Sequence, residues 1–156
     1  MVTQIRTSVF ETNSSSTHSV TIGDGEFIIP KDIKGEFTVC SGDYGWIQES
    51  YSRFFDKVSY AFTFAVNYST EEDLDLLNET LKKNLKGVEL VYEDSEGNQY
   101  YYEALVELLK NDEFPDFGYI DHQSIYKASE IFASERNLEN FLFCQDSSFE
   151  TDNDNH

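Results

Sequence analysis

The most informative stretch of the chain is SYSRFFDKVSYAFTFAVN, which covers residues 50–67. Apolar residues recur in it three or four positions apart, the spacing that places them on one face of a helix. That face comprises Phe54, Val58, Ala61, Phe62 and Ala65, and it is widened by the aromatic residues Tyr51, Phe55, Tyr60 and Phe64. A face this wide has to be covered on several sides. The stretch therefore predicts a central, largely buried helix.

Working outward, a second helix is predicted from residue 69, because a hydroxyl cap and three acids precede a leucine repeat that Gly87 ends. Further helices are predicted over 99–110 and 124–132. Strands are expected where β-branched and aromatic residues gather, at 5–11, 18–22, 26–29, 37–40, 88–93, 140–144 and 147–151. Together they predict one α+β domain over residues 1–151, with a mixed or antiparallel sheet packed against about four helices, and a frayed acidic tail over 152–156.

The composition limits the classes of function. The chain has 156 residues and a formal net charge of −19, from 30 acids and 11 bases. Such a surface repels phosphate, so we expect no direct binding to nucleic acid or to anionic membranes. Acidity favours docking in a basic groove of another protein, although it also serves solubility alone.

The location follows from what the sequence lacks. The first ten residues have no apolar core of a signal peptide, and no apolar run has the length of a membrane span. We therefore expect a cytoplasmic protein, in which Cys40 and Cys144 are free thiols or metal ligands rather than a disulfide.

Two histidines stand where a polar loop meets a regular element. His18 follows the loop of residues 12–17, and His122 lies within the segment 119–124. Imidazole is the commonest metal ligand, and thiolate or carboxylate can complete a tetrahedral zinc site. The predicted ligands of Zn²⁺ are therefore His18, His122, Asp43, Cys40 and Cys144. No CxxC or HExxH spacing enforces this site, so a hydrogen-bonded role stays open, with Asp121 orienting the imidazole of His122.

An enzyme is the main alternative. Ser14, Ser15 or Ser16 with a histidine and an aspartate would supply a nucleophile and its base. No G-x-S-x-G elbow singles out one serine, and hydroxyl-rich loops of this kind form hydrogen-bonded turns. A metal-dependent hydrolase with Glu11 or His122 as base remains the enzymatic alternative. We expect a non-enzymatic protein.

Two segments are candidates for binding a partner. Residues 89–116 carry nine acids and one lysine. We expect this span to face a basic partner through Glu89, Glu93, Asp94, Glu96, Asp112, Glu113 and Asp116. In the glycine-flanked loop 43–46, Trp46 would act either as an interface anchor or as a core plug.

The run IRTSVFETNSSSTHS of residues 5–19 resembles the N-terminus of a family of small phage and prophage proteins. Shorter matches cover residues 42–46, 57–60 and 119–124. The resemblance implies an inhibitor of host defence, similar to the anti-CRISPR proteins that bind an RNA-guided nuclease and block DNA loading, among which a type II inhibitor binds zinc. It implies action in the host cytoplasm, on the basic nucleic-acid-binding surface of a type II CRISPR effector nuclease. A phage structural or assembly protein is the other alternative.

Overall fold

Helix α1 (Phe54–Tyr68) runs through the middle of the molecule, as predicted. All ten residues from Lys57 to Val66 are buried. This is because five elements contact the helix: α2 (Glu71–Asn84), α4 (Ile125–Ser129), α5 (Glu135–Phe143), β3 (Glu36–Cys40) and β8 (Tyr119–Ile120). The structure is a computed structural model, and it describes residues 17–45, 47–111 and 114–151. Within them it is a single α+β domain of five α-helices and three small sheets.

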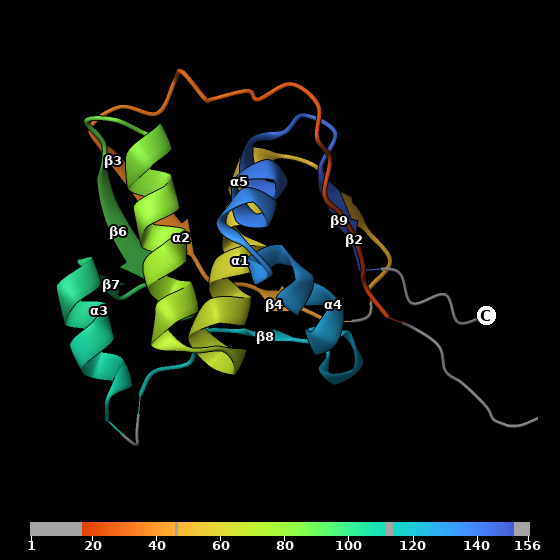
Figure 1. Cartoon of the computed structure of the whole chain (residues 1–156). Coiled ribbons are helices and arrows are strands. Elements are labelled where there is room, and N and C mark those ends of the chain that lie inside the picture. The colour runs from red at the N-terminus through yellow and green to blue at the C-terminus, as the bar shows by residue number, and fades with distance from the viewer. Residues whose placement is uncertain (1–16, 46, 112–113, 152–156) are drawn as a thin grey trace, which may run out of the picture.

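Helix α2 begins and ends as its sequence predicts. The Thr70 hydroxyl accepts a hydrogen bond from the Asp73 amide at 3.3 Å, which satisfies a free donor of the first turn. The chain leaves the helix through Leu85 and turns at Gly87, whose φ of +77° favours glycine. In Figure 1, α1 and α2 lie side by side between the remaining elements.

One sheet lies to the left of this helix pair in Figure 1 and contains β3, β6 (Glu89–Glu93) and β7 (Gln99–Tyr100). Strands β3 and β6 are parallel, because α1 and α2 form the crossover between them, and β7 returns antiparallel to β6. The sheet is therefore mixed, one of the two arrangements predicted. Helix α3 (Tyr102–Leu109) follows β7 after one residue. The predicted helix over 99–110 thus begins too early, at residues where tyrosine favours the strand.

The second sheet lies on the opposite side and is antiparallel, in the order β2 (Ser19–Thr21), β9 (Ser148–Glu150) and β5 (Ser50–Tyr51). Residues 50 and 51 therefore belong to a strand rather than to the central helix. Strands β4 (Asp43–Tyr44) and β8 form a separate parallel pair. The predicted strand at 26–29 is reduced to one isolated bridge between Phe27 and Cys144. The predicted strand 5–11, most of the loop 12–17 and the tail 152–156 lie outside the described residues.

The predicted strand at 140–144 is wrong, because these residues belong mostly to helix α5. The Ser134 hydroxyl accepts a hydrogen bond from the Asn137 amide at 3.0 Å and caps the helix. Leu138, Phe141 and Leu142 then share its buried face. Phe141 and Phe143, which flank Leu142, favour a strand by their own propensity. The Ser134 cap and Leu138 before them indicate the helix instead. The predicted helix 124–132 is present but divided into short pieces, namely η2 (His122–Ser124), α4 and η3 (Glu130–Phe132).

We expect Ser134→Ala to lower the free energy of unfolding by about 1 kcal/mol, because it removes the side-chain cap at the start of α5. Chemical denaturation followed by circular dichroism measures the change. Ser52→Ala, in an exposed position before α1, is the matched control and should stay within about 0.5 kcal/mol of the wild type. An equal loss in both variants would contradict the cap.

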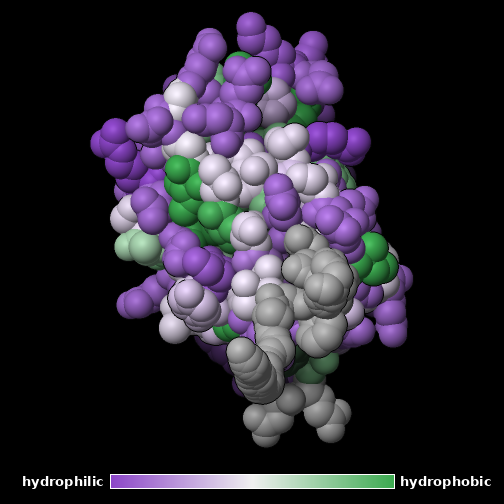
Figure 2. Space-filling model, turned by 90° about the vertical axis from the view of Figure 1, so that its right-hand side faces the viewer, coloured by the Kyte–Doolittle hydropathy of each residue, from purple (hydrophilic) through white to green (hydrophobic). Residues whose placement is uncertain are grey.

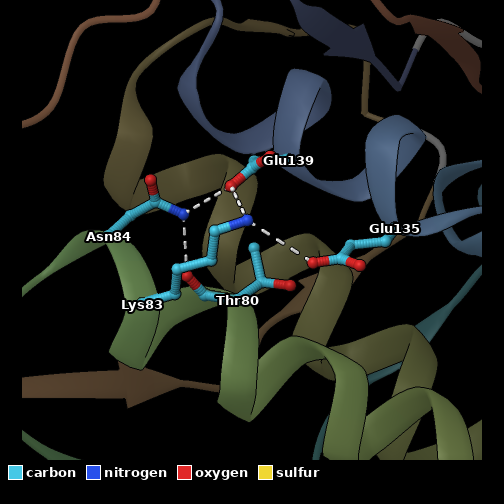
Figure 3. A network of polar contacts seen from close by, with 5 residues as sticks. All are labelled: Thr80, Lys83, Asn84, Glu135 and Glu139. Atoms are coloured by element: carbon cyan, nitrogen blue, oxygen red, sulfur yellow. Dashed lines mark hydrogen bonds and ion pairs between the residues drawn. The ribbon is translucent and has the colours of Figure 1, made fainter.

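Polar contacts join α5 to α2 at the surface, as Figure 3 shows. The Lys83 ammonium lies 3.3 Å from Glu139 and 3.6 Å from Glu135. The Asn84 amide donates to Glu139 at 2.9 Å and to the Thr80 carbonyl at 2.9 Å. Since the Lys83 side chain is 58% exposed, these ion pairs orient the helices more than they stabilise them.

No helix in the described part of the chain is both long and apolar enough to cross a membrane.

Candidate functional site

His18 is the centre of a buried polar cluster. The residue is only 2% exposed. One ring nitrogen, Nδ1, lies 2.8 Å from the Tyr60 hydroxyl, and the other, Nε2, lies 2.7 Å from the Gly45 carbonyl oxygen. The backbone amide of His18 donates to the Ser124 hydroxyl at 2.8 Å, and Ser124 donates in turn to Asp121 at 3.0 Å. Three distant segments are therefore joined at one residue.

These contacts define the protonation of the ring. A carbonyl oxygen only accepts hydrogen bonds, so Nε2 carries a proton and donates to Gly45. In the neutral imidazole, which burial favours, Nδ1 then accepts from the Tyr60 hydroxyl. Burial lowers the pKa of His18 below its ordinary value, although the Gly45 carbonyl and the Asp121 carboxylate act in the opposite direction. Burial likewise raises the pKa of the Tyr60 phenol, which therefore stays protonated.

We expect the protein to lose stability as the pH falls below about 6.5, where His18 takes up a proton in the unfolded chain but not yet in the folded one. The slope is at most about 1.4 kcal/mol per pH unit and disappears below the folded-state pKa. Thermal denaturation between about pH 5 and pH 8 measures it. His18→Gln should remove this dependence, whereas His122→Gln, at an exposed histidine, should keep it. A wild-type curve that is flat over this range would contradict the neutral, buried imidazole.

The predicted zinc ligands do not come together as a set. Asp43 and His122 are exposed, although their segments converge on His18 through Gly45 and Ser124. Cys40 lies at the end of β3, where burial and the nearby Glu93 carboxylate raise its pKa to about 11. Cys144 is buried at the end of α5, and its thiol donates to the Gly25 carbonyl. In the described ranges, no three residues among histidine, cysteine, aspartate and glutamate form a possible metal site.

The donor chemistry fits zinc poorly. Both ring nitrogens of His18 are already hydrogen-bonded, and cysteine binds zinc as a thiolate, which a raised pKa disfavours at Cys40. Zinc binding therefore stays a prediction. Glu11 and Ser14, Ser15 and Ser16, the residues of the enzymatic alternatives, lie outside the described residues.

A buried lysine lies near the end of α5. Lys57 on α1 is 3% exposed, and its ammonium donates to the carbonyl oxygens of Cys144 at 3.1 Å and Ser147 at 3.3 Å. Burial lowers the pKa of Lys57. The cation sits just beyond the C-terminus of α5, a position that the helix dipole favours. Lys57 therefore has a structural role, which its place among apolar residues hides in the sequence.

The predicted acidic surface divides into residues of different kinds. Asp94 is 3% exposed and accepts hydrogen bonds from the amides of Glu96 and Asn98 and from the Tyr100 hydroxyl. Burial alone would raise the pKa of Asp94, but these bonds outweigh it and lower the pKa. Asp94 thus organises the turn between β6 and β7 and is not a surface group.

The other members of that set remain nearer the surface. Glu89 and Glu96 are exposed, and Glu93 is half-buried and accepts from Gln99 at 3.0 Å. Asp116 accepts from the Gly118 amide at 2.8 Å and thereby shapes the loop before β8. Asp112 and Glu113 lie outside the described residues, as does Trp46.

Sequence reasoning missed Tyr60 and Ser124, the two residues whose side chains bond to His18. The sequence places Tyr60 on the apolar face of the central helix, which is correct for its ring, because the ring stacks on Phe149 at 4.1 Å. Ser124 stands at the start of the predicted helix 124–132, but its hydroxyl makes no cap bond to α4 and instead joins His18 to Asp121. Only a buried tyrosine's need for a hydrogen-bond partner could have indicated the pairing.

Comparison with known proteins gives no match to any family model, curated protein or solved structure.

Proposed function

We propose that the protein is a non-enzymatic inhibitor of host defence that binds a basic, nucleic-acid-binding surface of a host protein in the cytoplasm. The proposal is supported above all by the surplus of acids, a net charge of −19. Ion pairs among the described residues engage only six carboxylates: Asp56, Glu79, Glu107, Glu130, Glu135 and Glu139. Most of the exposed carboxylates in the described ranges thus form no ion pair within those ranges, and they can attract a basic partner.

The arrangement of the polar core is also consistent with a binding role. The hydroxyl, imidazole and carboxylate of Ser124, His18 and Asp121 belong to a buried hydrogen-bonded cluster, in which the serine is bonded to the backbone of His18 rather than to its ring. Figure 2 shows the side of the molecule that carries β2 and β9, on which hydrophilic residues predominate and hydrophobic ones gather in small areas. Such a surface suits polar and charged contacts.

Following the resemblance of residues 5–19, we take an RNA-guided nuclease of type II as the host protein. We expect the purified protein to bind this nuclease with an affinity that falls at least about tenfold between about 0.05 M and 0.5 M salt, since the contacts are mainly electrostatic. Biolayer interferometry measures the affinity, and cleavage of a target DNA measures inhibition. Full cleavage at saturating protein, or binding that is insensitive to salt, would contradict the proposal.

A further inference from the structure

A groove of about 330 Å³ lies between α2, α3 and the start of β6. Its wall on α2 is formed by Asn78 and Lys82, and its remaining lining residues are Val88, Glu89, Leu90, Tyr101, Tyr102 and Glu103. The groove thus combines aromatic rings with two carboxylates. This is the composition that recognises a cation with an extended apolar stem.

The walls of the groove are fixed before anything binds. Tyr102 on α3 donates its hydroxyl to Asp75 on α2, which ties the two helices together. Behind them, the buried Tyr92 of β6 donates to Asn78 on α2 at 2.7 Å. A ligand would therefore meet a preorganised surface, and little binding energy would be lost in ordering it.

The rim of the groove is short of positive charge. Glu89 and Glu103 are exposed, and neither forms an ion pair with another residue in the described ranges. Lys82, the single cation of the lining, is 4.0 Å from Glu79. In addition, Glu89 lies beside Glu36 in the parallel register of β6 and β3. Like charges in adjacent positions of a sheet destabilise it, and a bound cation would remove that cost.

Tyr101 supplies the element that makes the groove selective. It is the residue between β7 and α3, and it is 55% exposed although it is a large aromatic residue. A planar guanidinium can stack on such a ring and at the same time donate two parallel hydrogen bonds to a carboxylate, which an ammonium cannot do.

We propose that this groove binds an arginine side chain of the basic partner, stacked on Tyr101 and paired with Glu89 and Glu103. The inference rests on the proposed function for the nature of the partner, and it adds the binding residues and their chemistry. Within the acidic surface, the groove is then the place where a specific contact is made.

The test is to titrate the isotope-labelled protein with an oligo-arginine peptide and, separately, with an oligo-lysine peptide of equal length. Changes in the NMR chemical shifts of the backbone amides report the binding. We expect the shifts to concentrate at residues 88–90 and 101–103, and the arginine peptide to bind more tightly. Glu89→Gln with Glu103→Gln should weaken that binding about tenfold, and Tyr101→Ala about threefold. The control pair Glu26→Gln with Glu150→Gln removes the same charge from exposed positions outside the groove and should change the affinity less than about twofold.

Two results would overturn the proposal that the groove binds arginine. One is an equal loss of affinity in the control pair, and the other is equal binding of both peptides, since either one indicates unspecific attraction to a negative surface. These results leave nuclease binding by the wild type untouched. Conversely, a wild-type protein that fails to bind the nuclease but shows the expected shifts with the peptides would contradict the proposed function. It would still support arginine binding in the groove.

Discussion

Replacing Phe149 by alanine is expected to lower the free energy of unfolding by about 3–5 kcal/mol, because a large ring is lost from the interior. Phe149 is fully buried in β9 and stacks on Tyr60 at 4.1 Å and on Tyr51 at 4.6 Å. Tyr44 meets it edge-on at 5.5 Å, and Phe141 of α5 contacts it at 6.3 Å. Its removal leaves a cavity between the antiparallel sheet and α1. Urea denaturation monitored by tyrosine fluorescence measures the loss.

The matched control is Phe114→Ala. Phe114 is 43% exposed and contacts the ring of Phe117 at 6.3 Å. Its loss should cost less than about 1 kcal/mol. Phe149→Leu, which keeps most of the apolar volume, should cost less than about 2 kcal/mol. Similar losses for Phe149→Ala and Phe114→Ala would show that the rings do not form the centre of this side of the core.

Replacing His18 by alanine is expected to cost about 2–4 kcal/mol, because the change leaves the Tyr60 hydroxyl and the Gly45 carbonyl without their partner in a buried place. Thermal and chemical denaturation measure the loss. Since Tyr60→Phe removes the same hydrogen bond, the two changes should not add, and the double variant should be about 1 kcal/mol more stable than the sum of the single losses predicts. Strict additivity would contradict the hydrogen bond.

The His18→Ala variant also separates hydrogen bonding from metal binding. If the cluster is held by hydrogen bonds, a chelator should leave the melting temperature of the wild type unchanged. If His18 is a zinc ligand, the chelator should destabilise the wild type and have no further effect on His18→Ala. Elemental analysis of the purified protein provides the independent measurement.

Sequence reasoning predicted the fold class and most helices, since helix signals are local. The Thr70 cap, the leucine repeat and Gly87 lie within one short segment, so together they predict helix α2 without any knowledge of tertiary contacts. The sequence predicts a strand in place of the end of helix α5 because Phe141 and Phe143 have high β propensity, which packing against α1 and α2 overrides.

The candidate site was predictable only in part. Sequence reasoning chose His18 and the segments around Asp43 and residues 119–124, and the structure brings these segments together. It could not show that Tyr60, Ser124 and a backbone carbonyl would take both ring nitrogens and the amide, because those contacts span up to 106 residues. Similarly, nothing local distinguishes the buried Asp94 from its exposed acidic neighbours, since its burial depends on the turn that it organises.

The pairing of β9 with both β2 and β5 has a consequence for synthesis on the ribosome. The two outer strands emerge early, whereas the central strand emerges about a hundred residues after β5. Until then the edges of β2 and β5 have no partner in their sheet, and Tyr51 and Tyr60 lack the ring on which they stack. Unpaired edges of this kind associate readily with other chains. Emergence of β9 from the ribosome is therefore the event that closes this side of the molecule, and a nascent chain stalled before it is the form most exposed to aggregation and proteolysis.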